Sequence, residues 1–147
     1  MPGRTCKVKE LSRIMSTEDE IYQAPLPPAL IVHGLAQALQ ARALGLPMTL
    51  LSAPEAAGAW GCLWWQSLLT AAGHTGPALL DCGASPGRAV EALELGLSAI
   101  VLAHGPAWAE IKALAVRKRA LLLPTPPLAL DLGEKHAQER LIAWLSG

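Results

Sequence analysis

Short apolar runs alternate with longer segments of helical periodicity from Pro28 to the end of the chain. The runs are apolar at consecutive positions rather than at every second one, which is typical of strands buried on both faces. They cover residues 29–33, 48–52, 77–81, 99–103 and 120–124. The helical segments cover residues 35–44, 56–72, 86–95, 107–119 and 134–145. These repeated βα units predict an α/β fold with a five-stranded, mainly parallel sheet and right-handed crossovers.

Residues at the ends of these segments support the same division. Ser85 followed by Pro86 is a typical N-cap and first helical residue. The basic residues Arg117, Lys118 and Arg119 fall in a last helical turn, where cations oppose the helix dipole. Two architectures fit the five units: an open doubly wound sheet in the flavodoxin-like order 2-1-3-4-5, or half of a (β/α)8 barrel. Strand composition does not decide between them, because both bury both faces of the sheet.

Composition divides the chain near Pro25 and limits the function classes. Eight charged residues lie within the first 20 positions of the 147, and the stretch from Ala24 to Pro28 is rich in proline. We therefore expect residues 1–27 to form a tail or linker and residues 28–147 to form a single α/β domain. An apolar fraction of 52% excludes a disordered chain. Twelve basic residues balance twelve acidic ones, which argues against nucleic acid or an anionic membrane as a partner.

The cysteines and the longest uncharged stretch indicate a cytoplasmic protein. Cys6, Cys62 and Cys82 follow no CxxC or zinc-ribbon spacing, and a domain of this size needs no disulfide scaffold. The N-terminus lacks the apolar stretch and cleavage site of a signal peptide. The apolar residues 56–73 are at the lower length limit for a membrane span and fit a buried helix better. We therefore expect no membrane partner.

Polar side chains follow the predicted strands, at the edge where parallel α/β folds bind ligands. The residues at these strand ends are His33, Ser52, Asp81, Cys82, His104 and Thr125. We predict that His33, Cys82 and His104 are candidate ligands of zinc or another divalent metal ion. Asp81 is the candidate catalytic acid or base. In the order 2-1-3-4-5, His33 and Asp81 would flank the crevice where the strand order reverses.

Each of these residues also has a structural interpretation. Asp81 could cap the helix that begins at Pro86 or hydrogen-bond its own loop. Cys82 could be a small buried apolar residue, and the two histidines could be loop residues with locally satisfied ring nitrogens. At the entrance of the last helix, Asp131 and His136 need no role beyond capping.

A tryptophan-rich segment is the other unusual feature. Trp60 and Trp64 share one i, i+4 row of the predicted helix, and Trp65 lies on the next row. The resulting apolar stripe is wider than one sheet face requires. The segment is therefore either a core helix or a self-association surface with these three tryptophans as anchors, because aromatic residues dominate such hot spots. The second alternative predicts a homodimer.

Three motifs between residues 35 and 105 carry a resemblance to a known enzyme family. Residues 47–54 read Pro-Met-Thr-Leu-Leu-Ser-Ala-Pro, and Gly61 follows with aromatic neighbours. Residues 79–83 read Leu-Leu-Asp-Cys-Gly, and residues 92–102 read Ala-Leu-Glu-Leu-Gly-Leu-Ser-Ala-Ile-Val-Leu. These motifs resemble the second strand, the next helix and the His-Leu-Asp-His-Gly strand, with its sequel, of class II, metal-dependent fructose-bisphosphate aldolases.

The resemblance implies roles by position. Asp81 corresponds to the family's catalytic acid/base aspartate, Cys82 stands at a zinc-binding histidine, and Leu79 stands at the first histidine of the motif. The family's remaining histidine ligands come from later strands, and the fifth predicted strand here lacks the glutamate expected near it. We therefore expect an aldolase-like, non-catalytic module of half-barrel ancestry that binds a small ligand or partner, self-associates and holds no cofactor.

Two other functions remain open. One is a small metal-dependent aldolase or lyase in which Asp81 transfers protons and a zinc or other divalent ion polarises a carbonyl group. The other is a flavodoxin-like signalling or receiver module, which the lack of an acidic pair at the first strand end disfavours. The sequence contains neither GxGxxG after the first strand nor a P-loop.

Overall fold

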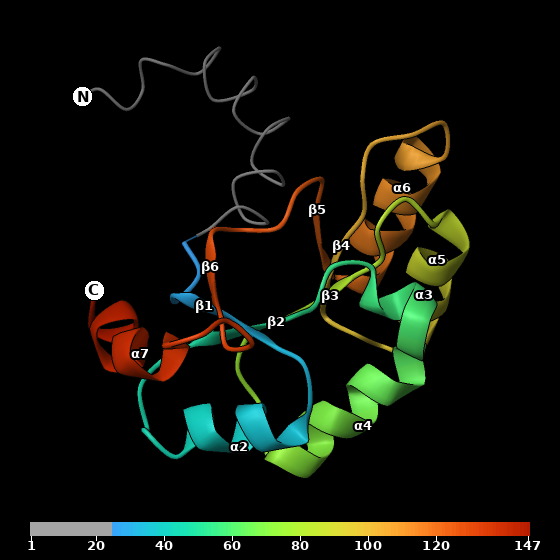
Figure 1. Ribbon diagram of the computed structural model, residues 1–147. Helices are drawn as coiled ribbons and strands as arrows, with labels where there is room; N and C mark the ends of the chain where they lie inside the picture. Colours follow the sequence, from blue (N-terminus) through green and yellow to red (C-terminus); the bar gives the residue numbers. More distant parts are fainter. Residues whose placement is uncertain (1–24) are drawn as a thin grey trace, which may run out of the picture.

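A computed structural model describes residues 25–147, which form a parallel sheet with helices on one side (Figure 1). The strands of this part of the chain are β1 (Ala29–Val32), β2 (Thr49–Ser52), β3 (Ala78–Asp81), β4 (Ala99–Val101), β5 (Leu121–Leu123) and β6 (Ala129–Asp131). The helices are α2 (Leu35–Arg42), α3 (Ala56–Trp60), α4 (Cys62–Ala72), α5 (Pro86–Glu94), α6 (Trp108–Lys118) and α7 (Ala137–Ser146). None of these helices has the length and apolar character that crossing a membrane requires.

The predicted α/β fold with a parallel sheet is confirmed. The five predicted strands are present, each within two residues of the expected bounds. The prediction of five strands missed β6, which follows β5 with no helix between them and so departs from the βα pattern. The predicted tail at residues 1–27 lies almost entirely outside the described residues, and the boundary at residue 28 stays a prediction.

The strand order is β5-β4-β3-β2-β1-β6, and every neighbouring pair is parallel. The flavodoxin-like order 2-1-3-4-5 is therefore wrong. Strands β1 to β5 are neighbours in chain order, which is the order of the half-barrel alternative. Strand β6 then pairs with the remaining edge of β1, so that Ile31 lies opposite Asp131.

All six helices of the described residues pack on the same face of the sheet. Right-handed crossovers between consecutive neighbouring strands place each helix on the same side, and α2, α4, α5 and α6 follow one another along it (Figure 1). The strand residues that face them are Leu30, Val32, Leu50, Leu80, Ile100, Leu122 and Leu130. These side chains and the apolar sides of the helices form the main hydrophobic core.

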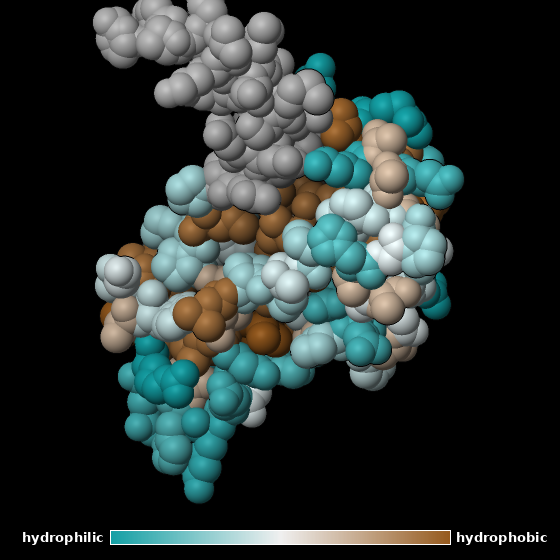
Figure 2. Space-filling model, turned by 90° about the horizontal axis from the view of Figure 1, so that it is seen from above, coloured by the Kyte–Doolittle hydropathy of each residue, from teal (hydrophilic) through white to brown (hydrophobic). Residues whose placement is uncertain are grey.

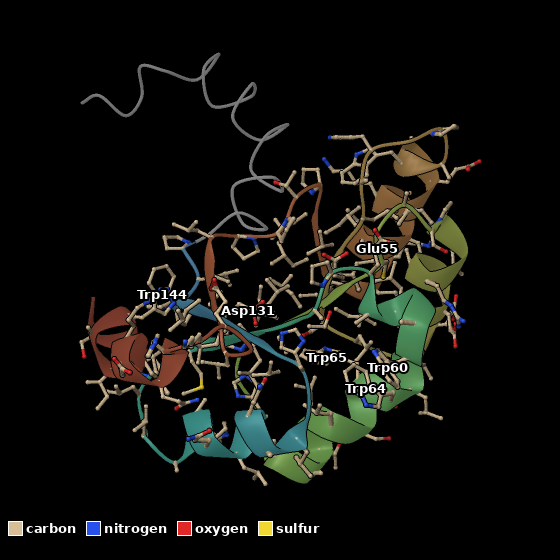
Figure 3. All side chains as sticks on the ribbon, in the orientation of Figure 1. Glu55, Trp60, Trp64, Trp65, Asp131 and Trp144 are labelled. Carbon is tan, nitrogen blue, oxygen red and sulfur yellow. The ribbon has the colours of Figure 1, made fainter. Side chains whose placement is uncertain are left out.

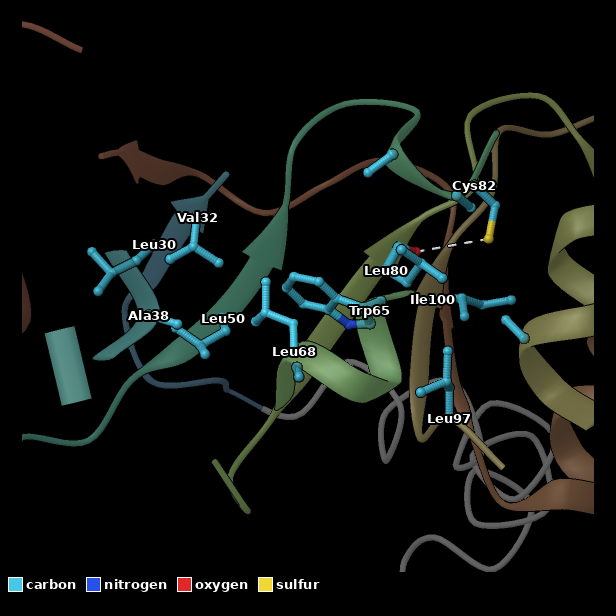
Figure 4. Close-up of a cluster of buried hydrophobic side chains, with 14 of the residues drawn as sticks. Leu30, Val32, Ala38, Leu50, Trp65, Leu68, Leu80, Cys82, Leu97 and Ile100 are labelled. Atoms are coloured by element: carbon cyan, nitrogen blue, oxygen red, sulfur yellow. Dashed lines mark hydrogen bonds between the residues drawn. The ribbon is translucent and has the colours of Figure 1, made fainter. Parts of the chain in front are cut away.

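Trp65 is the largest fully buried side chain of this core. It extends from α4 and lies among Leu50, Leu68 and Leu80 (Figure 4). For Trp65, the structure therefore confirms the core interpretation, and the prediction that this residue anchors an intermolecular surface is wrong.

The opposite face of the sheet carries a second, smaller hydrophobic cluster that no helix of residues 25–147 covers. Its buried strand residues are Leu51, Leu79, Ala99 and Val101. The connection between β5 and β6, residues 124–128, runs over this face (Figure 1). We call this connection the proline strap, because it contains Pro124, Pro126 and Pro127. Seen from above, hydrophobic residues gather near the middle of the visible face (Figure 2).

The proline strap requires the sheet to curl. Strands β5 and β6 form opposite edges of the sheet. In a flat sheet these edges would be about 24 Å apart, because neighbouring strands are about 4.8 Å apart. Six Cα–Cα steps from Leu123 to Ala129 span at most about 20–22 Å. This stretch must also return from the carboxyl end of β5 to the amino end of β6, so the sheet cannot be flat.

The helix predicted over residues 56–72 is broken in two. Gly61 has a φ of 91° and a ψ of 156°, which no α-helix accommodates, and α3 ends there before α4 begins. The last helix begins at Ala137, three residues later than expected, because His136 adopts a left-handed conformation with a φ of 65°. Ser85 accepts a hydrogen bond from the Arg88 amide and caps α5, as predicted.

We expect Trp65→Ala to destabilise the protein by about 3–5 kcal/mol, because it leaves a large cavity in a close-packed core. Ile142→Ala on α7 is the control, since Ile142 is 60% exposed, and it should cost less than about 1 kcal/mol. Urea unfolding followed by circular dichroism measures both. Equal losses of unfolding free energy in the two variants would contradict the assignment of Trp65 to the core.

Candidate functional site

A recess of about 290 Å³ lies between the sheet and the proline strap, at the carboxyl ends of β2 and β3. Its walls are formed by Ile31, Leu51, Ser52, Pro54, Asp81, Pro126, Pro127, Leu128 and Ala129. Most of these residues are apolar. Among the described residues that line the recess, Asp81 is the only charged one. Leu128 is 84% exposed, so the recess reaches the surface beside it. This is the edge at which parallel α/β folds bind ligands.

Asp81 is only 7% exposed, and hydrogen bonds hold it in a fixed position. Its backbone N–H donates to Ser52 Oγ at 2.9 Å, and its Oδ1 accepts the Gly83 N–H at 2.8 Å. The Gly83 carbonyl in turn accepts the Ala103 N–H at 2.8 Å. The predicted local role of Asp81, a hydrogen bond within its own loop, is therefore present, whereas the cap of α5 is Ser85.

The Ser52 hydroxyl links the ends of β2 and β3 through hydrogen bonds. Its Oγ accepts the Asp81 N–H and donates to the Ala53 carbonyl at 3.2 Å. The ladder pairing of β2 with β3 ends at Leu51 and Leu79, so this hydroxyl takes the place of a backbone acceptor. Leu79, which the aldolase resemblance places at the first histidine of the motif, is fully buried in the cluster below the recess.

Glu55 lies against Gly83, the residue whose N–H donates to Asp81. A Cβ atom on Gly83 would lie 2.7 Å from Glu55 Cγ, and Gly83 has a φ of 59°. Only glycine fits here without displacing Glu55, and it also adopts the required left-handed conformation without strain. Glu55 itself lies at the start of α3 (Figure 3) and lines an adjacent hollow of about 440 Å³ together with Cys82 and Ser85.

His33 is paired with Asp131 and not with Asp81. His33 Nε2 lies 2.6 Å from Asp131 Oδ1, which also accepts the Gly133 N–H at 2.8 Å. Gln37 accepts the His33 backbone N–H at 2.8 Å. A Cβ on Gly133 would lie only 2.9 Å from His33 Nε2, so this close approach requires glycine. The pair leaves the second ring nitrogen, Nδ1, for other contacts.

The expected crevice between His33 and Asp81 is absent from the described residues. That prediction depended on the order 2-1-3, whereas β2 lies between β1 and β3. The ends of β1 and β3 are therefore about 10 Å apart. Both residues do lie at the carboxyl edge of the sheet, as the parallel arrangement requires.

His104 lies against an aromatic ring in a third hollow. Its ring centroid is 4.1 Å from that of Trp108, and the two residues line a hollow of about 220 Å³ with Pro86, Leu102 and Ala107 among its walls. Thr125, predicted at the end of the fifth strand, is exposed in the proline strap.

Cys82 behaves as the small buried residue of the structural interpretation. Its Sγ lies 3.8 Å from the Leu80 carbonyl oxygen (Figure 4). Burial, more than any nearby charge, raises the pKa of the Cys82 thiol to about 12 and that of the Cys62 thiol to about 11. Both thiols are therefore protonated near neutral pH, and a protonated thiol is a poor nucleophile and a poor metal ligand.

The structure does not bring the three predicted metal ligands together. His33 contacts Asp131, Cys82 points at a backbone carbonyl, and His104 stacks on Trp108. Within residues 25–147 no group of three or more histidine, cysteine, aspartate or glutamate side chains is arranged to hold a metal ion. A zinc or other divalent site stays a prediction that the structure does not support.

Sequence reasoning missed two parts of the site. Asp131 was assigned to the entrance of the last helix, but it ends β6 beside His33. The signal was a short apolar run, residues 128–130, that ends in a polar residue, as the other strands do. The contribution of Pro126, Pro127 and Leu128 to the recess had no local signal, because they lie far along the chain from Asp81.

Two other predictions of local structure hold in part. Arg117 and Lys118 lie in the last turn of α6, and Lys118 Nζ is 3.3 Å from Glu94 Oε1, whereas Arg119 is the left-handed residue that ends the helix. His136 occupies the N-cap position of α7, but its side chain makes no capping hydrogen bond, and its Nδ1 is 2.7 Å from Glu139 Oε1.

Comparisons of the chain with protein-family models, with curated proteins and with solved structures find no match. The resemblance to class II aldolases therefore stays a prediction that no comparison tests.

We expect both described thiols to resist alkylation. In a Cys6→Ser background, iodoacetamide at pH 8 should modify Cys62 and Cys82 at least about a hundredfold more slowly in the native protein than in urea, because their thiolate fractions are small. Intact-mass spectrometry over time measures the rates. Labelling of native Cys82 at the rate of the unfolded chain would show that its thiol is accessible and ionised.

Proposed function

We propose that this chain is a non-catalytic binding module whose small ligand occupies the recess between the proline strap and the sheet. The observation that carries the proposal is the Asp81 carboxylate, which is nearly buried and lines a recess with otherwise largely apolar walls. Small-molecule sites combine such apolar walls with a few well-placed polar groups.

The polar groups around the recess favour binding over chemistry. Ser52 already donates and accepts a hydrogen bond, and Cys82 is protonated near neutral pH. Neither is available as an activated nucleophile, which needs a neighbouring base or a lowered pKa. Among the described residues that line the recess, Asp81 is the one charged group that can contact a ligand, and its hydrogen bonds hold it in position before binding.

We further propose that the module associates with a second copy of itself through a surface formed by Trp60, Leu63 and Trp64. Trp60 and Leu63 are 66% and 60% exposed, and Trp64 is half-buried. The rings of Trp60 and Trp64 are 6.0 Å apart at the junction of α3 and α4 (Figure 3). Exposed aromatic residues of this kind are the usual anchors of protein interfaces.

A fragment titration followed by amide NMR tests the ligand site. We expect small fragments to shift the amides of Ile31, Leu51, Gly83 and Ala129 and to leave Ile142 on α7 unchanged. Ala129→Leu adds side-chain volume to the recess and should weaken binding at least about tenfold, a change of about 1.4 kcal/mol. Ala109→Leu on the exposed side of α6 is the matched control and should not weaken it. A library that shifts none of the lining residues would refute the ligand site.

Light scattering after size-exclusion chromatography tests self-association. We expect a mass twice the 15.4 kDa of the chain at micromolar concentration. Trp60→Lys should yield the monomer, because it places a charge in the apolar contact. Ile142→Lys, which changes a similarly exposed residue on α7, should leave the dimer intact. A monomeric wild-type protein is the outcome that would exclude this surface as an interface.

A further inference from the structure

The Asp81 carboxylate has one hydrogen bond and an oxygen left open to a ligand. Oδ1 accepts the Gly83 N–H, and within residues 25–147 no donor is bonded to Oδ2. Oδ2 is not a buried atom, because His74 Nδ1 is the only buried side-chain nitrogen or oxygen without a partner among these residues. Asp81 as a whole is 7% exposed and lines a recess whose described walls contain no lysine, arginine or histidine. A cation in the recess would therefore meet this carboxylate and no competing positive charge.

The remaining walls define what a ligand must present besides a charge. Ile31, Leu51 and Leu128 contribute aliphatic side chains, and Pro126 and Pro127 contribute rigid rings. Apolar surface buried against these walls stabilises a complex, while a hydrated inorganic cation would gain nothing from them. The walls therefore favour a cation that carries an apolar body.

A second carboxylate increases the negative potential at this edge. Glu55 lies against Gly83, and the Gly83 N–H donates to Asp81, so both acidic side chains adjoin one glycine. Glu55 is exposed and outside the recess, so its effect on a ligand is weaker and screened by salt. Both carboxylates attract positive charge and oppose the entry of anions.

We propose that the recess binds a small organic amine, with its ammonium group hydrogen-bonded to Asp81 and its apolar body packed against the proline strap. This inference rests on the proposed ligand site and specifies the chemical class of its ligand. An ammonium ion supplies the donors that Oδ2 lacks, and hydrogen bonds between two charged groups are among the strongest in proteins.

Three probes of one shape test the proposal: cyclohexylmethylamine, cyclohexylmethanol and cyclohexanecarboxylate. Their dissociation constants are measured by amide NMR at neutral pH, with the full chain. We expect the amine to bind at least about tenfold more tightly than the alcohol, and the carboxylate to bind most weakly. Asp81→Asn keeps an oxygen for the Gly83 N–H and removes the charge. It should weaken amine binding at least tenfold and alter alcohol binding less than twofold.

Glu55→Gln is a second variant, and it changes a residue that lies outside the recess. It should weaken amine binding by a smaller factor than Asp81→Asn, and this factor should shrink as salt is added. Alcohol binding equal to amine binding, or amine affinity unchanged in Asp81→Asn, would overturn the amine proposal while leaving the ligand site intact. If none of the three probes shifts the lining amides, both the amine proposal and the proposed function fail.

Discussion

The packing of every described helix against one face of the sheet is the constraint on which the other features depend. It follows from consecutive parallel neighbours joined by right-handed crossovers. The main core, with Trp65 at its centre, forms entirely on that side. The opposite face of the sheet also carries apolar side chains, and within residues 25–147 the proline strap crosses it. The recess beside Asp81 exists because this cover is a short loop and not a helix.

The sequence was sufficient to predict most of the helices and strands, but not the order of the strands in the sheet. The five predicted strands were readable because runs of consecutive apolar residues are typical of strands buried on both faces. The same property concealed the strand order, since a strand buried on both faces looks alike in a doubly wound sheet and in a half barrel. Strand β6 follows β5 after five residues with no helix between them, so it does not continue the βα pattern. The break at Gly61 depends on a backbone conformation that glycine permits but does not require.

Prediction of the site succeeded where it depended on strand direction. Asp81, His33 and His104 do follow parallel strands and lie at one edge of the sheet. Their grouping depended on strand order, and with β2 between β1 and β3 they contact different partners. Asp131 and the proline strap contribute to the site through contacts between residues about 45 to 100 positions apart in sequence, which local patterns cannot reveal.

The proline strap has a consequence for how the molecule opens. It connects two edge strands that no hydrogen-bond ladder joins, and only five residues separate them. Fraying of β5 at one edge therefore pulls on β6 at the other. Edge strands usually exchange their amide hydrogens independently of each other, in separate local openings. Here the two edges should exchange as one cooperative unit, and the recess would be lost in the same event.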